Sequence, residues 1–318
     1  MGKYFNKVGK LMNKTAWLFP GQGSQNVGMG KDLFEGTDLG FELFELSNDI
    51  MGFDIKNIIF NGPEKTLKKT QYTQPALFIV SVIIGKSLIE KGLIPDALAG
   101  HSLGEYSALS IAGSFDFKTG LELVKIRSES MADAGKFESG SMAAIIGLKD
   151  SIIIDLCNNY DGKGVVTPAN FNSPGQIVIS GNKNAVFSIM EIAKIKGARL
   201  CVELNVSGAF HSPLMKPAKQ KLSEAIERSS ISDAKYPVYT NYTSKHVIKK
   251  KDIKESLIEQ LEHPVLWSKS ILSMENIGIF NYYEVGPGNI LKGLNKRINR
   301  KLNTICLGTL KELENLNV

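Results

Sequence analysis

The chain has 318 residues, of which 43% are hydrophobic and 22% are charged, and these values are ordinary for a folded globular protein. Such a length allows one large domain or two smaller ones. The net charge is +6, and no tract combines dense Lys and Arg with interleaved aromatic residues, which argues against a nucleic-acid partner. A mildly basic surface is compatible with an acidic protein partner.

Membrane and secretory segments are not expected. The longest apolar run, residues 76–84, is much shorter than the roughly 20 residues that a membrane-spanning helix requires. The first 12 residues are basic without a continuous apolar stretch, so they do not form a secretory signal, and we expect a loose tail there. Cys157, Cys201 and Cys306 lie far apart. They form neither a metal-binding pair nor an even disulfide set, which predicts a cytoplasmic protein.

The first half of the chain alternates strand and helix patterns. Residues 15–20 predict a short strand that leads into a Gly-rich loop, and residues 72–92 are apolar nearly all round, which predicts a buried helix. Residues 96–100 predict a second strand, followed by helices at 103–112 and 117–133. This alternation is typical of an α/β fold with a mostly parallel sheet.

The pattern changes between residues 138 and 204, where the order becomes strand, helix, strand, strand, helix, strand. This is the order of a ferredoxin-like unit. We expect a small subdomain at 138–204, inserted into a larger domain formed by 1–137 and 205–318. The later predicted elements are a helix at 213–229, a strand at 236–242, helices at 252–262 and 267–277, a strand at 281–286, a helix at 289–299 and a strand at 304–308.

A candidate nucleophile lies in the sequence GHSLG, residues 100–104, between a predicted strand and a predicted helix. A sharp strand–turn–helix needs small flanking residues, so Gly100 and Gly104 both have a steric role. The turn sets the oxygen of Ser102 at the start of a helix, where backbone N–H groups stabilise an oxyanion. The alternative is a serine that only caps the helix.

Four histidines are candidates for the base. His101 is next to the serine, but on such a turn the neighbouring side chain points away, so we expect a structural role. His246 and His263 lie among charged residues and are expected at the surface or at a helix end. His211 precedes a Ser-Pro pair that is typical of a helix start, which would hold it rigidly. Taken alone, it is also compatible with a structural role.

Arg127 lies on the predicted helix at 117–133, on a face of small and apolar residues. A guanidinium on such a face has to find an anion. A structural ion pair with a buried glutamate and an anionic group of a substrate both satisfy this requirement, and the residues alone leave both open.

Six motifs occur in a fixed order, and together they resemble the malonyl-CoA:acyl carrier protein transacylases of fatty-acid synthesis. The resemblance extends from about residue 13 to residue 310. The motifs are FPGQGSQNVGMG (19–30), GHSLGEYSAL (100–109), ANFNSPGQIVISG (169–181), GAFHSPLM (208–215), HPVLWSKS (263–270) and EVGPGNIL (284–291).

The resemblance implies an activity and a fold. Members transfer malonyl from malonyl-CoA to the phosphopantetheine thiol of acyl carrier protein through a malonyl-serine intermediate. The fold would be α/β, with a larger α/β-hydrolase-like domain, a mostly parallel sheet and the inserted ferredoxin-like subdomain. We expect no metal and no prosthetic group, an acidic acyl carrier protein as partner, and a monomer.

The resemblance also implies roles for individual residues. Ser102 would be the nucleophile and His211 the general base. Backbone N–H groups of Gln22 and Leu103 would form the oxyanion hole. The histidine would be oriented by a backbone carbonyl, which we assign to Leu266, although relatives often carry a polar residue at that position.

Substrate binding is implied for four further positions. Arg127 would bind the free carboxylate of malonyl, because its planar guanidinium can hold a carboxylate through two hydrogen bonds. Phe210 is bulky and would leave no room for a methyl branch, so we expect malonyl to be preferred over methylmalonyl. Asn170 and Asn172 match residues near the cleft between the subdomains, although turn formation explains them equally well.

Two later features remain open. Residues 286–288, Gly-Pro-Gly, would border the pocket or form a plain turn. A basic cluster would dock the carrier protein or form a solvated helix face. It consists of Lys292, Lys296, Arg297, Arg300 and Lys301.

Two other functions share part of this pattern. A serine hydrolase of the α/β-hydrolase type has the order Ser, acidic residue, His, but Arg127 has no role in it. An acyltransferase that loads a polyketide synthase carrier protein shares every motif. Neither GxxxxGK[ST] nor GxGxxG is present, so the Gly-rich segments are not phosphate loops.

Overall fold

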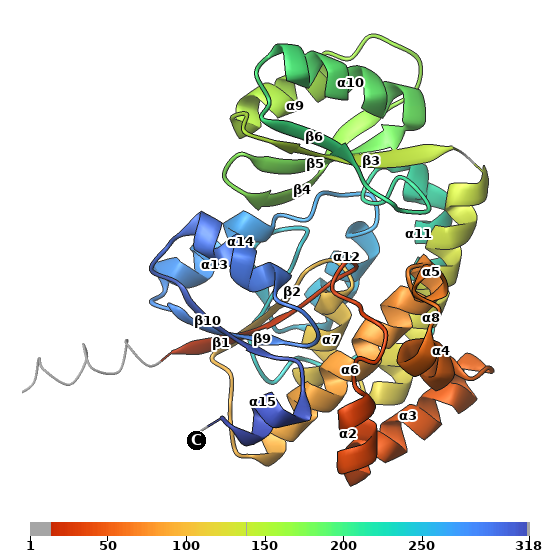
Figure 1. Ribbon diagram of the computed structural model, residues 1–318, viewed down its shortest axis with the longest axis vertical. Helices are drawn as coiled ribbons and strands as arrows, with labels where there is room; N and C mark the ends of the chain where they lie inside the picture. Colours follow the sequence, from red (N-terminus) through yellow and green to blue (C-terminus); the bar gives the residue numbers. More distant parts are fainter. Residues whose placement is uncertain (1–13, 138, 317–318) are drawn as a thin grey trace, which may run out of the picture.

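The larger sheet has six strands in the order β10-β9-β1-β2-β7-β8 (Figure 1). The computed structural model describes residues 14–137 and 139–316, so the tail expected over the first 12 residues lies outside the described part. All neighbouring strands are parallel except β7 and β8, which are antiparallel. The strands are β1 (Thr15–Phe19), β2 (Ala97–Gly100), β7 (Val238–Tyr239), β8 (His246–Val247), β9 (Asn281–Val285) and β10 (Asn303–Leu307). The predicted mostly parallel sheet is therefore confirmed.

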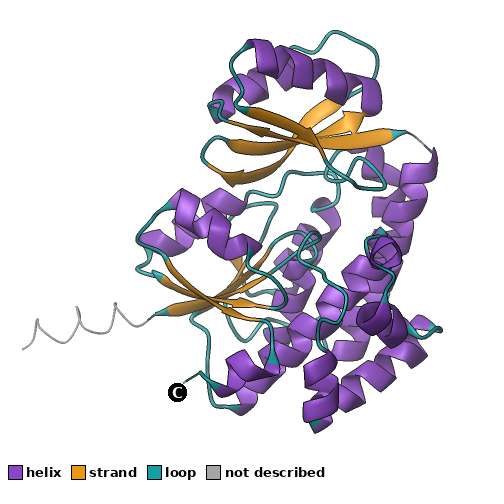
Figure 2. Cartoon of the chain, viewed as in Figure 1, coloured by secondary structure: helices purple, strands orange, loops and turns teal. Residues whose placement is uncertain are grey.

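Helices lie on both faces of this sheet (Figure 2). They include α6 (Thr70–Glu90), α7 (Gly104–Ile111), α8 (Phe117–Phe137), η1 (Pro213–Met215), α11 (Lys216–Arg228), α12 (Lys250–Glu259), α13 (Trp267–Asn276), α14 (Ile290–Ile298) and α15 (Leu310–Glu314). Strands covered on both faces carry continuous apolar runs, as in β2, where all residues are buried. Helix α6 has the length and composition of a membrane span, but 78% of its most apolar stretch is buried inside the protein. It is a core helix, as its pattern predicts.

A second sheet has four strands in the order β4-β5-β3-β6, and every neighbouring pair is antiparallel. The strands are β3 (Gly140–Ile146), β4 (Val166–Ser173), β5 (Gln176–Asn182) and β6 (Leu200–Glu203), and the helices α9 (Asp150–Asn158) and α10 (Lys183–Ile195) alternate with them. Ala143, Ile145, Ile177 and Ile179 form one apolar cluster with residues of these helices. The element order predicted for this segment is confirmed.

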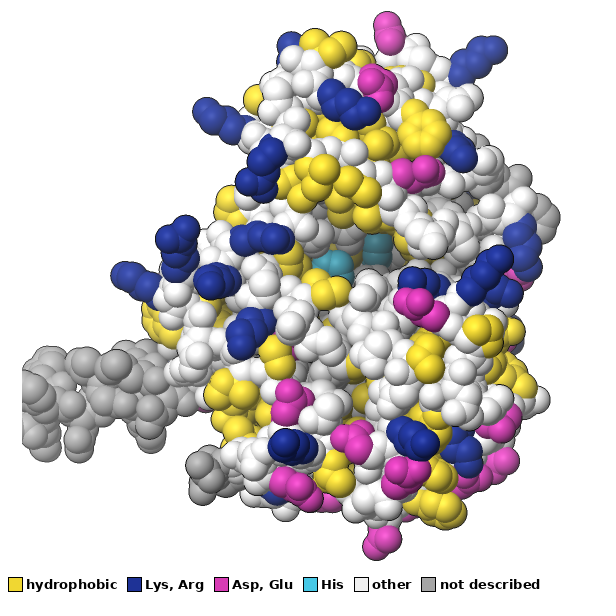
Figure 3. All heavy atoms as spheres, viewed as in Figure 1, with side chains coloured by type: hydrophobic (Ala, Val, Ile, Leu, Met, Phe, Trp, Pro, Cys, Tyr) yellow, Lys and Arg dark blue, Asp and Glu magenta, His cyan; other side chains and the backbone are white. Residues whose placement is uncertain are grey.

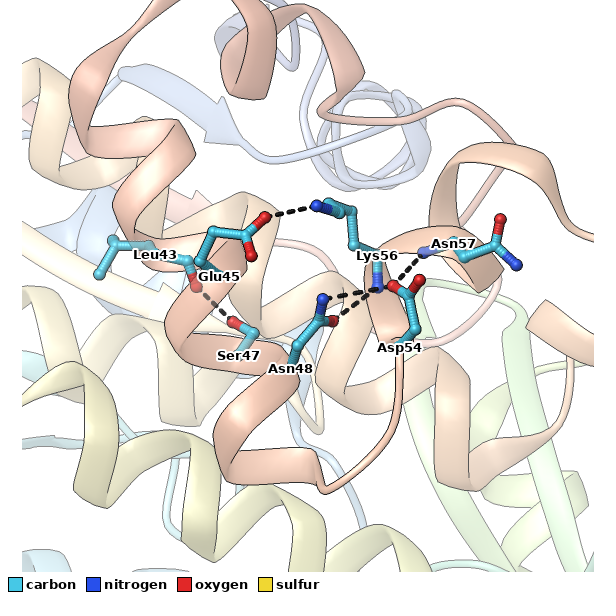
Figure 4. Close-up of polar contacts among 7 residues, drawn as sticks. All are labelled: Leu43, Glu45, Ser47, Asn48, Asp54, Lys56 and Asn57. Carbon is cyan, nitrogen blue, oxygen red and sulfur yellow. Dashed lines mark hydrogen bonds and ion pairs between the residues drawn. The ribbon is translucent and has the colours of Figure 1, made fainter.

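Helices between residues 31 and 67 have no counterpart in the sequence prediction. They are α2 (Lys31–Gly36), α3 (Asp38–Met51), α4 (Ile55–Asn61) and α5 (Glu64–Leu67). Polar contacts fix the turn between α3 and α4 (Figure 4): Asp54 caps α4 by accepting the N–H of Asn57 at 2.9 Å, and Asn48 accepts the N–H of Lys56 at 3.2 Å. Such capping residues are a readable helix-start signal. The strand predicted at 236–242 is much shorter than expected, because only Val238 and Tyr239 pair.

Candidate active site

Ser102 lies in the turn between β2 and α7, with a φ of 52°. This left-handed conformation is uncommon for a residue other than glycine. A Cβ atom on Gly100 would overlap the backbone of Gly104, and a Cβ atom on Gly104 would overlap the carbonyl of Phe19. The steric role predicted for both glycines is confirmed. The tight turn lifts the serine away from the sheet at the carboxyl end of a parallel strand.

His211 reaches Ser102 across 109 positions of sequence, and its Nε2 lies 2.8 Å from the serine Oγ. The histidine is 3% exposed and precedes Ser212, the N-cap of η1. The hydroxyl of Ser212 accepts the N–H of Leu214 at 3.3 Å, so the predicted cap at this helix start is confirmed. Figure 3 shows histidine side chains at the bottom of a hollow below the part of the molecule that carries the second sheet.

The carbonyl that orients His211 belongs to Gln260 and not to Leu266. The Nδ1 of His211 lies 2.8 Å from the carbonyl oxygen of Gln260. Gln260 is the C-cap of α12, and carbonyls at a helix C-terminus have no partner within the helix. Leu266 instead begins α13, so its carbonyl accepts the N–H of Ser270 at 3.0 Å inside that helix. The assignment of Leu266 was therefore wrong. A helix was predicted from residue 267, and the residue just before a helix start gives its carbonyl to the first intrahelical hydrogen bond.

The pKa of His211 is lowered to about 3, first by burial and then by the positive charge of Arg127, while hydrogen bonds to backbone carbonyls act in the opposite direction. The imidazole is therefore neutral near pH 7. With the proton on Nδ1 donated to Gln260, the lone pair of Nε2 faces Ser102. This is the form in which a histidine can accept the proton of a nucleophile.

Arg127 is 1% exposed and contacts the nucleophile directly. Its Nη2 donates to the Oγ of Ser102 at 3.0 Å and to Oε1 of Gln260 at 2.9 Å, and its Nη1 donates to Oε1 of Gln74 at 2.6 Å. Its Nε–H has no partner among the described residues. Glu105 lies nearby, but no ion pair joins it to Arg127 within the described part of the chain, so the alternative of a structural ion pair is not what the structure has.

A buried carboxylate lies one helical turn after the nucleophile. Glu105 is 0% exposed, and its Oε2 accepts the backbone N–H of Asn241 at 2.8 Å and the Nε2–H of Gln260 at 2.9 Å. Burial raises the pKa of Glu105 to about 7, against the effects of these hydrogen bonds and of Arg127. The side chain of Asn241 accepts the N–H of Ser102 at 2.6 Å and donates to the carbonyl of Gly100 at 2.6 Å.

Sequence reasoning missed four residues of this network: Gln74, Glu105, Asn241 and Gln260. Two of them carried a signal, because Gln74 and Glu105 are polar residues on otherwise apolar helices. Asn241 and Gln260 have no local signal, because only the fold brings them to Ser102.

The predicted oxyanion donors are available. The backbone N–H groups of Gln22 and Leu103 make no hydrogen bond to another residue of the described ranges, whereas the N–H of Ser102 is taken by Asn241. A Cβ atom on Gly21 would overlap the carbonyl of His101. The Gly-rich loop after β1 is therefore packed directly against the nucleophile turn.

The other residues predicted to bind substrate have the following neighbours. Phe210 is 6% exposed, precedes His211 and packs in the main apolar core. Asn170 pairs with Val265 through a backbone bridge. The Oδ1 of Asn172 lies 2.8 Å from Nε2 of His101.

The other histidines do not contact the serine through their rings. The structural role expected for His101 is confirmed by its bond to Asn172 and by its ring contact with Trp267, whose centroid lies 5.5 Å away. His246 is exposed. His263 lies at a helix end, with Nδ1 2.9 Å from the carbonyl of Glu259.

A serine on a strand–turn–helix, a neutral histidine beside it and unpaired backbone N–H groups define a site for nucleophilic acyl chemistry. The comparisons agree with this class. The family described as the acyl transferase domain matches residues 16–290. The malonyl CoA-acyl carrier protein transacylase of Bacillus subtilis is 42% identical over 304 residues, which are 95% of this chain and 96% of that protein.

Solved structures give the same result. The malonyl CoA-acyl carrier protein transacylase of Coxiella burnetii superimposes with a TM-score of 0.92 at 38% identity, over 96% of each chain. A malonyl-transacylase in complex with its type II PKS acyl-carrier protein superimposes with a TM-score of 0.91 at 38% identity, over 95% of this chain and 98% of that chain. The chain belongs to the malonyl CoA-acyl carrier protein transacylase family.

Proposed function

We propose that this protein transfers malonyl from malonyl-CoA to the phosphopantetheine thiol of acyl carrier protein, through an ester on Ser102, and so supplies fatty-acid elongation. One observation carries the proposal: the Oγ of Ser102 lies 2.8 Å from Nε2 of His211 and 3.0 Å from Nη2 of Arg127. The nucleophile, a base and a cation for the malonyl carboxylate thus meet at one point.

In the first half-reaction, Nε2 of His211 takes the proton of Ser102 as Oγ attacks the thioester carbonyl. The N–H groups of Gln22 and Leu103 stabilise the oxyanion. When the tetrahedral intermediate collapses, the C–S bond breaks and His211 returns the proton to the departing CoA sulfur. A malonyl ester of Ser102 remains.

The carboxylate of malonyl pairs with the Nε–H of Arg127, which has no partner among the described residues, and with the Nη2–H that donates to Oγ of Ser102 before the substrate binds. A guanidinium binds a carboxylate through two parallel hydrogen bonds. An acetyl group has no carboxylate, so it would leave the buried cation without a counter-charge. Phe210 beside His211 limits the space for a branch at the α-carbon, which supports malonyl over methylmalonyl.

In the second half-reaction, the phosphopantetheine thiol of the carrier protein enters in place of CoA. His211 accepts the thiol proton and the sulfur attacks the ester carbonyl. When the tetrahedral intermediate collapses, the bond between the acyl carbon and Oγ breaks and His211 returns the proton to Oγ of Ser102, which leaves malonyl on the carrier thiol. We assign contacts with the pantetheine arm to Asn170 and Asn172, and the bond of Asn172 to His101, the neighbour of Ser102, supports this assignment. Every step uses side chains and backbone groups of this chain alone, so the proposed mechanism needs no prosthetic group.

We assign carrier docking to a basic cleft of about 1880 Å³ between the second sheet and helices α13 and α14. Its lining includes seven cations and, among the described residues, one carboxylate, Asp150; the cations are Lys149, Arg199, Lys269, Lys296, Arg297, Arg300 and Lys301. Lys and Arg side chains gather on this side of the hollow in Figure 3. Acyl carrier protein, if acidic, would be attracted to this surface. Replacing Arg297 by Glu should raise the KM for the carrier while acylation by malonyl-CoA keeps its rate.

We also propose the domain organisation described for the sequence: a larger α/β-hydrolase-like domain of residues 1–137 and 205–318, with a ferredoxin-like subdomain at 138–204. Support comes from the strand order β4-β5-β3-β6 and its antiparallel pairing. Split βαβ units produce this arrangement.

The test is mass spectrometry of the protein after mixing with malonyl-CoA. We expect a malonyl adduct on Ser102, and its loss when a fatty-acid carrier protein is added. Absence of the adduct would refute the mechanism, and loss to water as fast as transfer to the carrier would indicate a hydrolase. A polyketide carrier protein is the second acceptor to compare, because the chain is similar to a malonyl-transacylase solved with such a carrier. Faster discharge to that carrier would favour the polyketide function.

A further inference from the structure

We propose that Glu105 is a positioning residue for the transfer reaction. One of its carboxylate oxygens holds Asn241 and Gln260, which fix the Ser102 turn. The same oxygen sets the orientation of the Gln260 amide, which in turn contacts Arg127. This inference rests on the proposed function, because the step that it concerns is the acylation of Ser102.

The nucleophile is held on both sides of its backbone. Asn241 Oδ1 accepts the N–H of Ser102 at 2.6 Å, and Gln260 Nε2 donates to the carbonyl of Ser102 at 3.0 Å. Ser102 has a φ of 52°, and such a backbone costs on the order of 1–3 kcal/mol and persists only where the surroundings determine it. The two side-chain amides supply that constraint.

Asn241 and Gln260 both donate a hydrogen bond to the same oxygen of Glu105. Glu105 Oε2 accepts the backbone N–H of Asn241 at 2.8 Å and the side-chain N–H of Gln260 at 2.9 Å. The two partners lie 136 and 155 positions further along the chain. The other oxygen, Oε1, has no partner in the described part of the chain. A proton taken up by this carboxyl would therefore lie on Oε1 and leave Oε2 as an acceptor.

The carboxylate, together with the carbonyl of Ser102, determines how the amide of Gln260 is oriented. Because Oε2 of Glu105 accepts, Gln260 must direct its nitrogen toward Glu105, and its oxygen then faces Nη2 of Arg127 at 2.9 Å. An amide turned by half a rotation would place two N–H donors against a guanidinium, which has no acceptor. Nη2 of Arg127 donates one N–H to this oxygen of Gln260 and the other to Oγ of Ser102, at 3.0 Å. Glu105 thus helps to fix the position of Nη2 beside the nucleophile.

Gln260 joins the same chain to the base, because its backbone carbonyl holds Nδ1 of His211 at 2.8 Å. Gln260 therefore contacts the nucleophile, the base and the substrate-binding cation. Loss of Glu105 would remove one of the bonds that hold Gln260 in place. A displacement of about 1 Å among reacting groups can cost about 100-fold in rate. We therefore expect Glu105→Ala to lower the rate constant of acylation about 100-fold, with the KM for malonyl-CoA changed less than about threefold.

The experiment is rapid-quench mass spectrometry of malonyl-serine formation, which separates the rate constant from the amplitude. A residue needed only for folding would lower the amplitude and leave the rate constant of the folded molecules unchanged. Glu105→Gln keeps an oxygen for the two N–H donors, so its rate constant should stay within about tenfold of the wild type. Ser47→Ala is the matched control: among the described residues its buried hydroxyl bonds only to the carbonyl of Leu43, at 2.6 Å in α3 (Figure 4). Its removal should leave the rate constant unchanged.

A second readout is the malonyl-to-acetyl preference. Gln260→Leu keeps the backbone carbonyl but removes the amide, and it should lower this preference in the same direction as Glu105→Ala. A wild-type rate constant in Glu105→Ala, or a wild-type preference in Gln260→Leu, would overturn the inference. If the wild-type protein forms no malonyl-serine, the proposed function fails instead, so the two failures are distinguishable.

Discussion

The two sheets of this protein have different interiors. Between the second sheet and helices α9 and α10 the buried cluster is apolar. At the carboxyl ends of the parallel strands β1, β2 and β7, the interior instead holds Arg127, Glu105 and His211, each at most 3% exposed. Groups that lose water without full pairing are costly to bury. The apolar interior of the small sheet therefore contributes mainly stability, and the polar interior at the parallel sheet contributes mainly chemistry.

The largest expected effect is the loss of malonyl-serine formation at the parallel sheet, while the free energy of unfolding stays nearly unchanged. Ser102→Ala should abolish the malonyl adduct, because no other group takes the place of Oγ beside Nε2 of His211. The free energy of unfolding should change by less than about 1 kcal/mol. Mass spectrometry and denaturant unfolding measure the two quantities. A remaining adduct in this variant would place the nucleophile elsewhere.

The next effect concerns discrimination between substrates. Arg127→Ala should reduce acylation by malonyl-CoA about 100- to 1000-fold and should affect acetyl-CoA much less. The reason is that only malonyl offers a carboxylate to the buried guanidinium. Initial rates with both thioesters are the measurement. An unchanged ratio of the two rates would show that Arg127 has a structural role.

A substitution in the small sheet should have the opposite profile. Ile179 on β5 is 0% exposed and packs in the cluster with α9 and α10. Ile179→Ala should lower the free energy of unfolding by about 2–5 kcal/mol, because it removes buried atoms and leaves a cavity. The rate constant of malonyl-serine formation by the folded molecules should stay the same. A large fall in that rate constant would mean that the two regions are not separate.

The two regions also differ in how much of each could be predicted from the sequence. The second sheet followed from alternating apolar patterns, and the nucleophile turn followed from two glycines around a serine. The partners of that serine depend on long-range packing, so Asn241 and Gln260 were not predicted, and the orienting carbonyl was assigned to Leu266. That error arose from helix boundaries, since a carbonyl at the end of α12 is free and one at the start of α13 is not.

The smallest effect, and the one that tests the polar interior most directly, is a pH dependence of stability. The pKa of Glu105 is about 7 in the folded protein, against an ordinary 4.5. Between pH 4.5 and 7 the folded state holds a proton that the unfolded state has released, so this group lowers stability as the pH rises. His211, whose pKa is lowered to about 3 from 6.5, acts in the opposite sense, because the unfolded state binds a proton below pH 6.5 that the folded state does not.

The two contributions nearly cancel between pH 4.5 and 6.5 in the wild type, so the difference between variants is the informative quantity. Glu105→Gln removes one contribution, and its free energy of unfolding relative to the wild type should rise by about 1.4 kcal/mol per pH unit in this window. Urea unfolding at several pH values from 4.5 to 7.5 measures the difference. Parallel curves for the two proteins would mean that Glu105 titrates in the folded protein as it does in the unfolded chain, and that its burial has no electrostatic cost.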